Sequence, residues 1–282
     1  MSKVAIVTDS TVTIPADLVA QYNLTVAPQV LIWGNKTYRD GIDIQPAEFY
    51  NRLKSASVMP TTSQATIQTF NEIYESLLSK GNEILTITIS KALSGTLDSA
   101  MQARQNFPGA AIEIVDSQTT AMAMGFQVLA AARAAAEDAT LAECTALAQK
   151  SREHTGVIFA VDTLEFLYRG GRIGGGSRFL GSALNIKPIL EVTGGKIEGI
   201  ERVRTRKKSL QRVVEIIGER TANRQPVHLA TLHANAEAEA REILDLASKQ
   251  FKAVESIFTE VSPVIGTHAG PGTVGLAFMA GM

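Results

Sequence analysis

The sequence of 282 residues lacks several features that would narrow its function at once. It has a single cysteine, Cys144, so no disulfide can form within the chain and a reducing compartment is expected. No run of about 18 apolar residues occurs, and the apolar run before Asp9 is too short for a signal peptide. We therefore expect a cytoplasmic protein that does not insert stably into a membrane.

The chain also lacks an excess of charge of either sign, because 27 basic residues face 28 acidic ones. Such a balance provides no global field for nucleic acid, and aromatic residues are not interleaved with the basic ones. The histidines show no metal-ligand spacing, and one cysteine cannot complete a zinc site. We expect neither a nucleic-acid partner nor a metal.

Familiar cofactor and catalytic motifs are missing too. Residues 270–275 match the dinucleotide fingerprint as a string, but too few residues follow for a βαβ unit. There is no Walker A sequence and no Gly-x-Ser-x-Gly elbow, so Ser94 is a poor candidate for a hydrolase nucleophile. The sequence predicts no cofactor.

What is present is a regular alternation of strand and helix patterns up to residue 155, typical of a parallel sheet covered by helices. From Val157 the strands follow one another at shorter spacing, which predicts a second, α+β lobe. We therefore predict an α/β protein with an N-terminal lobe at 1–155 and a C-terminal lobe at 156–282. Strands are expected at 4–7, 25–33, 84–89, 112–116, 157–161, 189–192, 196–203, 225–232 and 254–261. Helices are expected at 15–22, 45–54, 67–79, 97–107, 119–138, 141–153, 177–184, 207–222, 236–251 and 273–279, and a loop at 35–43.

Two clusters of hydroxyl groups precede predicted helices. Ser94-Gly95-Thr96 lies between a strand and a helix, and Thr62-Ser63-Gln64 lies just ahead of another helix. Unpaired N–H groups in the first turn of a helix favour an anion, although Ser94 or Thr96 could equally be a simple N-cap. His268, between two glycines at the expected start of the last helix, is a further candidate ligand contact.

One basic cluster stands out, at the start of the helix predicted at 207–222. Cations are unfavourable there, which points to an anionic ligand or an acidic partner surface. Arg169 and Arg172 could extend it. The cluster consists of Arg202, Arg204, Arg206, Lys207, Lys208 and Arg212.

Seven short motifs, in order along nearly the whole chain, together resemble the DegV family. They are Thr8-Asp9-Ser10, Thr62-Ser63-Gln64, Ser94-Gly95-Thr96, Asp116-Ser117, Arg169-Gly170-Gly171-Arg172-Ile173, Arg204-Thr205-Arg206-Lys207-Lys208 and His268-Ala269-Gly270-Pro271-Gly272. The resemblance implies one DegV domain over 3–280, with two α/β lobes and a buried ligand at and beyond their interface. Members of that family are bacterial fatty acid-binding proteins, among them the FakB subunits that present a fatty acid to a separate fatty acid kinase.

The resemblance also implies roles for individual residues. Thr62, Ser94 and His268 would hold the fatty acid carboxylate, with support from Ser63, Gly95 and Thr96. Arg172 and Arg204 would belong to the face that meets the kinase. Ala65 departs from the family, which commonly has proline there.

Neutral hydroxyls suffice to orient a carboxylate, so a positive charge beside it is unnecessary. Its absence would leave the carboxylate oxygen nucleophilic enough to accept a phosphoryl group. Candidates for lining the acyl tunnel are Phe159, Leu164, Phe166, Leu167, Ile173, Phe179, Leu180 and Leu184, and ordinary core packing is the alternative for each of them. The chain is then a carrier and not an enzyme. Two alternatives stay open: a small-molecule hydrolase or acyltransferase that uses Ser94, Thr62 and His268, and a regulatory module for another anionic metabolite.

Overall fold

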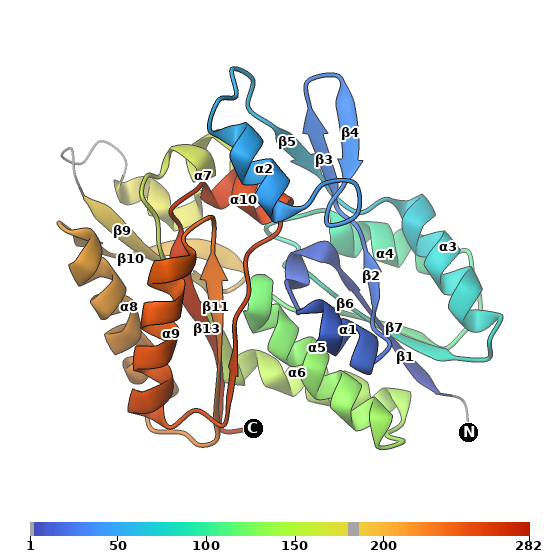
Figure 1. Ribbon diagram of the computed structural model, residues 1–282. Coiled ribbons are helices and arrows are strands. Elements are labelled where there is room, and N and C mark those ends of the chain that lie inside the picture. The colour runs from blue at the N-terminus through green and yellow to red at the C-terminus, as the bar shows by residue number, and fades with distance from the viewer. Residues whose placement is uncertain (1–2, 180–185) are drawn as a thin grey trace.

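The computed structural model describes residues 3–179 and 186–282 (Figure 1). The side chain of Phe179 is outside this description. Within these residues the strands form three sheets of four, six and three strands. No helix of the described residues has the length and apolar character that crossing a membrane requires.

The four-stranded sheet is parallel throughout, in the order β2-β1-β6-β7. Its strands are β1 (Val4–Asp9), β2 (Thr25–Ala27), β6 (Glu83–Thr88) and β7 (Ile112–Asp116). Successive side chains of a strand point to opposite faces of the sheet, so alternate residues of these strands pack into different hydrophobic cores. Val7, Ile84 and Ile112 pack with α3 (Ile67–Leu78) and α4 (Thr96–Arg104). Ile6, Leu85 and Val115 pack in the core that includes α5 (Ala121–Ala136) and α6 (Leu141–Ser151), so helices cover both faces.

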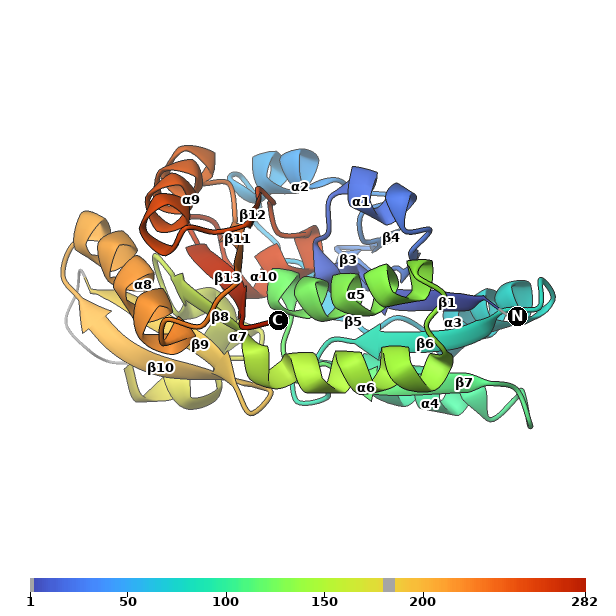
Figure 2. The ribbon, with the colours of Figure 1, turned by 90° about the horizontal axis from the view of Figure 1, so that it is seen from below.

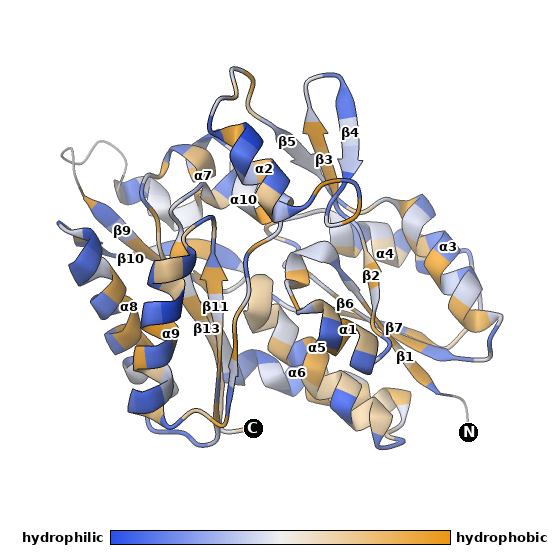
Figure 3. Ribbon diagram, in the orientation of Figure 1, coloured by the Kyte–Doolittle hydropathy of each residue, from blue (hydrophilic) through white to orange (hydrophobic). Residues whose placement is uncertain are grey.

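The six-stranded sheet is mixed, in the order β10-β9-β8-β13-β11-β12, and only β11 and β12 are parallel neighbours. One face packs against α8 (Arg206–Thr221) and α9 (Glu237–Phe251). The other face packs against α5, which also contacts β1, so a continuous core joins the two large sheets (Figure 2). Figure 3 shows hydrophobic residues along β1 and β11 and hydrophilic patches on α8 and α9. The strands are β8 (Thr155–Ala160), β9 (Lys187–Thr193), β10 (Lys196–Val203), β11 (Val227–His233), β12 (Glu255–Ile257) and β13 (Val274–Ala280).

The third sheet is small and antiparallel, in the order β4-β3-β5. A helix from the far end of the chain, α10 (Pro263–Ala269), packs against β3, β5 and α2. This contact brings a late segment of the sequence, 263–269, against an early one, 30–63. The remaining elements are α1 (Ala16–Gln21), β3 (Val30–Trp33), β4 (Lys36–Arg39), α2 (Pro46–Leu53), β5 (Thr61–Ser63), α7 (Glu165–Arg169) and the short 3-10 turns Ser10–Val12, Arg152–His154 and Gly174–Phe179.

The predicted fold class is confirmed: the protein is α/β, with a parallel-sheet part and a separate mixed-sheet part. The first strand of the six-stranded sheet begins at Thr155. The division into lobes at 1–155 and 156–282, and a domain over 3–280, stay predictions.

The prediction of a helix at 273–279 was wrong, because these residues form β13 near the middle of the six-stranded sheet. All seven residues of the strand are buried, and so short an apolar run has no periodicity that separates strand from helix. A side chain at Gly275 would meet the neighbouring strand β8, which identifies this glycine as a point of close backbone approach.

Other boundaries were also wrong. The single strand expected at 25–33 is two strands in different sheets, with Pro28 between them. The loop expected at 35–43 contains β4, and the strand expected at 254–261 covers only Glu255–Ile257. For the helix expected at 177–184, residues 177–179 lie in a 3-10 turn and 180–184 lie outside the described residues. Helices α7 and α10 were not predicted.

Candidate functional site

A narrow, mainly apolar cavity opens where the carboxyl ends of the parallel strands, the small sheet and the mixed sheet meet. It encloses about 750 Å³ of space between atoms, its open mouth included. Two of its lining residues, Ser63 and Gln64, are exposed. The polar lining residues are Thr11, Gln29, Thr62, Ser63, Gln64, Ser94, Thr120, Arg172 and His268. The apolar ones are Ile89, Leu93, Val157, Phe159, Leu167, Val192, Ile197, Leu232, Val264, Ile265 and Ala269.

The structure brings Thr62 and His268 together from β5 and α10. Thr62 Oγ1 lies 2.7 Å from His268 Nε2, although 206 positions separate the two residues in the sequence. His268 lies in the last turn of α10, so its expected place at the start of a helix was wrong. The glycine-rich turn after it leads into a strand.

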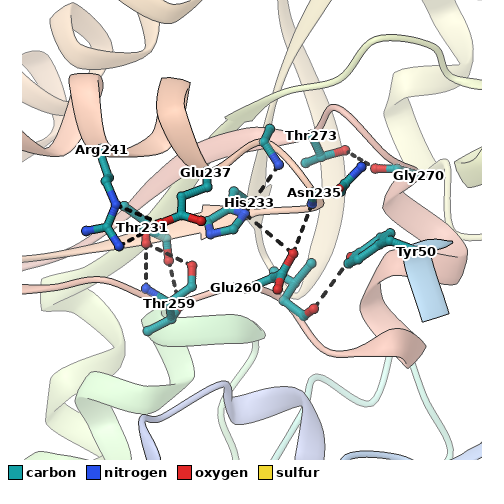
Figure 4. A network of polar contacts seen from close by, with 12 residues as sticks. Tyr50, Thr231, His233, Asn235, Glu237, Arg241, Thr259, Glu260, Gly270 and Thr273 are labelled. Carbon is teal, nitrogen blue, oxygen red and sulfur yellow. Dashed lines mark hydrogen bonds and ion pairs between the residues drawn. The ribbon is translucent and has the colours of Figure 1, made fainter. Parts of the chain in front are cut away.

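Polar contacts on both sides of α10 hold this helix in place (Figure 4). Before the helix, Thr259 N donates to Thr231 Oγ1 over 2.6 Å and Thr259 Oγ1 donates to Thr231 O over 3.0 Å. Tyr50 Oη donates to Val261 O over 3.5 Å, and after the helix Thr273 Oγ1 donates to Gly270 O over 2.9 Å. His268 is therefore presented by a helix that is tied down at both ends.

The imidazole of His268 is held neutral. Burial is the main cause that lowers its pKa to about 4, and the positive charge of Arg172 adds to the effect. Nδ1 is buried without a hydrogen-bond partner in the described residues. The imidazole ring of His268 packs against Gly170, and a Cβ atom added at Gly170 would overlap this ring. Gly170 is thus a site residue that sequence reasoning missed, although it lies within the Arg169-to-Ile173 motif.

Ser94 lies in the connection between β6 and α4, as predicted. Gly95 occupies the N-cap position of α4, so the alternative interpretation, in which Ser94 or Thr96 is the N-cap, was wrong. Ser94 Oγ lies 2.9 Å from Thr96 Oγ1 and accepts from Thr96 N over 3.4 Å. A Cβ atom at Gly95 would lie 3.3 Å from the side chain of Gln64, so this glycine allows the two hydroxyl clusters to come close.

Arg172 also lines the cavity. Its guanidinium donates to Leu93 O over 3.1 Å from Nε and to Gly170 O over 2.7 Å from Nη1. Arg172 therefore brings a positive charge to the cavity that His268 also lines, although a positive charge is not necessary to orient a carboxylate. Arg204 is exposed and is not among the lining residues.

Much of the predicted basic cluster is neutralised by ion pairs. Arg206 pairs with Glu239, and Arg212 contacts Glu201 and two further glutamates on its own helix. Arg169 pairs with Glu165 on α7. Glu239 and Glu201 come from other elements, α9 and β10, whereas the remaining glutamates lie on the same helix as the arginine that they contact. Among its other members, Arg204, Lys207 and Lys208 are exposed.

The geometry does not favour hydrolysis. In the described part of the chain no hydrogen bond joins Ser94 to His268, since His268 pairs with Thr62 and Ser94 with Thr96. A histidine whose pKa is about 4 is also a weak general base near neutral pH. The same residues, 3–179 and 186–282, contain no group of three or more His, Cys, Asp or Glu placed to hold a metal ion.

The expected tunnel residues divide into three groups. Phe159 and Leu167 line the cavity, whereas Leu164, Phe166 and Ile173 pack in the surrounding core. The Phe179 side chain, Leu180 and Leu184 lie outside the described residues. The sequence analysis missed lining residues near strand ends, such as Ile89 and Leu232. Each lies where a predicted buried strand runs into a loop, and this position could have identified them.

Replacing His268 by glutamine should flatten the pH dependence of stability. The unfolded chain takes up a proton at the ordinary histidine pKa of 6.5, whereas the folded protein resists protonation until about pH 4. The unfolded state therefore binds more protons in this window, and stability falls as pH decreases from 6.5 to about 4. Urea unfolding of ligand-free protein should show wild type losing roughly 2 kcal/mol more than His268→Gln across the window. Parallel curves for the two proteins would contradict a buried neutral His268.

Comparisons with known proteins agree with one another. Residues 3–281 match the DegV family model, described as "Uncharacterised protein, DegV family". A DegV domain-containing protein of Streptomyces coelicolor is 36% identical over 275 residues, which cover 97% of each chain. The structure is similar to that of the fatty acid binding DegV family protein from Thermus thermophilus, with a TM-score of 0.93, 33% identity and 99% of each chain covered. It is also similar to DegV, a fatty acid binding protein from Bacillus subtilis, with a TM-score of 0.90 and 32% identity over 99% of this chain and 100% of the other.

Proposed function

This chain belongs to the DegV family, and from that premise we propose that it binds a long-chain fatty acid in the cavity described above. Thr62, Ser94 and His268 hold the carboxylate, with Ser63, Gly95 and Thr96 in support. The acyl chain lies along the apolar lining. The observation that carries this proposal is the combination, in one narrow cavity, of hydroxyl groups with a mainly apolar wall. The two fatty acid binding relatives of the same fold support it.

The hydrogen-bonding state of His268 supports a carboxylate in particular. Among residues 3–179 and 186–282, Nδ1 of His268 has no hydrogen-bond partner, and a buried N–H group without an acceptor costs more free energy than a buried nitrogen lone pair without a donor. The favoured tautomer therefore carries its proton on Nε2 and donates it to Thr62 Oγ1. The Thr62 hydroxyl proton is then free to point at an acceptor such as a carboxylate oxygen.

Burial of the hydrocarbon supplies most of the affinity. About 15 methylene groups at ~0.8 kcal/mol each release on the order of 12 kcal/mol, from which the cost of association is subtracted. The polar groups then need only to orient the head group. Arg172 adds a cation to the same cavity wall, held by carbonyl oxygens and not by a carboxylate in the contacts described.

The proposed role is that of a carrier that presents the fatty acid to a fatty acid kinase. Such a partner would bring its own nucleotide and metal, and the carboxylate would accept the phosphoryl group. Arg172 and Arg204 are the proposed contacts on the kinase side. Arg204 is exposed, whereas Arg172 is half-buried and lines the cavity, so the two would act at different depths. The chain itself is proposed to have no catalytic activity, and its proposed compartment is the cytoplasm.

Native purification followed by denaturation, organic extraction and mass spectrometry tests the binding proposal. The expected result is a long-chain fatty acid in a near-stoichiometric amount. The extract of His268→Gln protein prepared in parallel serves as a comparison for ligand retention. An empty extract, together with failure to bind added palmitate or oleate, would contradict the proposal and favour a module for another anionic metabolite.

A further inference from the structure

A buried glutamine outside the proposed carboxylate contacts, Gln29, lines the cavity and is linked to Ser94 through Thr96. Gln29 comes directly after Pro28, which follows β2, and Gln29 is only 2% exposed. Its Nε2 donates to Thr96 Oγ1 over 2.7 Å, and Thr96 Oγ1 lies 2.9 Å from Ser94 Oγ. A three-residue chain of hydrogen bonds thus runs from Gln29 to Ser94, which lines the cavity.

The orientation of the Gln29 amide is set by Asp9, a fully buried carboxylate. Asp9 accepts from Thr11 N over 3.0 Å, Thr11 Oγ1 over 2.6 Å and Ile89 N over 2.8 Å. Burial raises the pKa of Asp9, and these donors together with the nearby Gln29 side chain oppose that rise. The opposite orientation of the amide would place its oxygen against this carboxylate. The NH2 group of Gln29 therefore serves both acceptors, Asp9 and Thr96.

The direction of the next hydrogen bond follows from the burial of Thr96. This residue has no exposed surface, so its hydroxyl proton needs an acceptor inside the protein. Thr96 Oγ1 already receives a proton from Gln29, and Ser94 Oγ is the acceptor that the described contacts place within reach. Ser94 Oγ thus accepts from Thr96 Oγ1 and from Thr96 N. The proton of Ser94 is left to donate into the cavity.

Gln29 is also rigidly held by its backbone. Gln29 N donates to Ser10 Oγ over 3.0 Å, and Ser10 Oγ donates to Asp40 Oδ2 over 2.6 Å. Asp40 Oδ1 accepts from Val264 N in the first turn of α10, over 3.2 Å. Through these bonds, Gln29 connects the Ser94 side of the cavity with α10, the helix that carries His268.

We propose that Gln29 is a positioning residue that acts through Thr96 to turn the Ser94 hydroxyl into an obligate donor, so that the site selects an ionised carboxylate. This inference rests on the proposed function. It predicts selectivity by head group, because a carboxylate can only accept whereas the hydroxyl of a fatty alcohol can either donate or accept.

The test is the affinity of Gln29→Met protein for palmitate and for hexadecanol, which have chains of the same length. Methionine fills similar space and cannot donate, so Thr96 Oγ1 becomes free to accept from Ser94. Palmitate should bind about tenfold more weakly than to wild type, because a hydrogen bond to a charged group is lost. Hexadecanol should change by less than about threefold, because its hydroxyl adapts to either direction.

Two further variants separate positioning from packing. Thr96→Val removes the oxygen toward which the Ser94 hydroxyl can turn when Gln29 is lost, with little change of shape, so it should weaken palmitate binding less than Gln29→Met does. The double variant should recover most of the affinity that Gln29→Met loses, because Ser94 then has no Thr96 hydroxyl to which it can donate. Gln127→Met is the matched control: it removes another buried glutamine that donates to a threonine, Thr155, away from the cavity. It should leave the preference for palmitate unchanged.

Equal weakening of both ligands by Gln29→Met, or no change in either, would overturn the inference while leaving fatty acid binding intact. A double variant that binds palmitate as weakly as Gln29→Met, or more weakly, would overturn it as well. Failure of the wild-type chain to bind palmitate is a different result, which would overturn the proposed function and this inference with it.

Discussion

Replacing Ser94 by alanine and Thr62 by valine in one protein is expected to weaken fatty acid binding by at least about 100-fold. Each change removes a hydroxyl donor to the carboxylate, and hydrogen bonds to charged groups contribute about 1.5–3 kcal/mol each. Thr62→Val also leaves His268 Nε2 without its partner at 2.7 Å. Titration calorimetry with delipidated protein measures the loss, and each 1.4 kcal/mol corresponds to about a factor of ten.

A matched control removes the same two groups elsewhere. Ser99→Ala in α4 and Thr145→Val in α6 delete one serine and one threonine hydroxyl from residues that do not line the cavity. That protein should bind within about threefold of wild type. Near-normal binding by the Ser94→Ala, Thr62→Val protein would contradict the assigned head-group site and point to Arg172 as the main contact. Ester hydrolysis by the wild-type chain alone would instead revive the hydrolase alternative.

Replacing Gly275 by alanine is expected to lower the free energy of unfolding by about 3 kcal/mol or more. Gly275 pairs with Phe159 of β8 on one side and Leu232 of β11 on the other. An added Cβ would lie 2.5 Å from Phe159 Cβ and closer still to the carbonyl oxygen of Ile158. These are atoms of a central sheet, which cannot move apart without breaking the ladder of hydrogen bonds. Urea unfolding measures the effect.

Gly81→Ala is the control for this prediction. Gly81 has a φ of 77°, and nothing lies within 4 Å of an added Cβ, so only the cost of the backbone conformation applies. That cost is about 1–2 kcal/mol for a residue with a side chain in this region. If Gly275→Ala cost no more than Gly81→Ala, the close approach of β13 to β8 would be wrong. Because Phe159 and Leu232 line the cavity, Gly275→Ala should also weaken palmitate binding.

Local signals in the sequence were sufficient for much of the fold. The apolar runs of β1, β6 and β7 with helices between them predicted a parallel sheet, since strands buried on both faces need continuous apolar residues. The strand-to-helix connection at Ser94-Gly95-Thr96 was also predicted from local signals, because the strand pattern ends just before it and the helix pattern begins just after it. The error at β13 has the opposite origin. Its seven residues fit either structure in isolation, and only their place between β8 and β11 makes them a strand.

The sequence by itself determined the fold class, the family and the residue types available for a head group, because these depend on local periodicity and on short motifs read in order. Only the tertiary structure decided which of those residues meet. It brings His268 against Thr62 across 206 positions, places Arg172 in the cavity wall and links Gln29 to Ser94 through Thr96. The physical reason is that local propensity acts over a few residues, whereas a cavity is made by the packing of elements that are far apart in the chain.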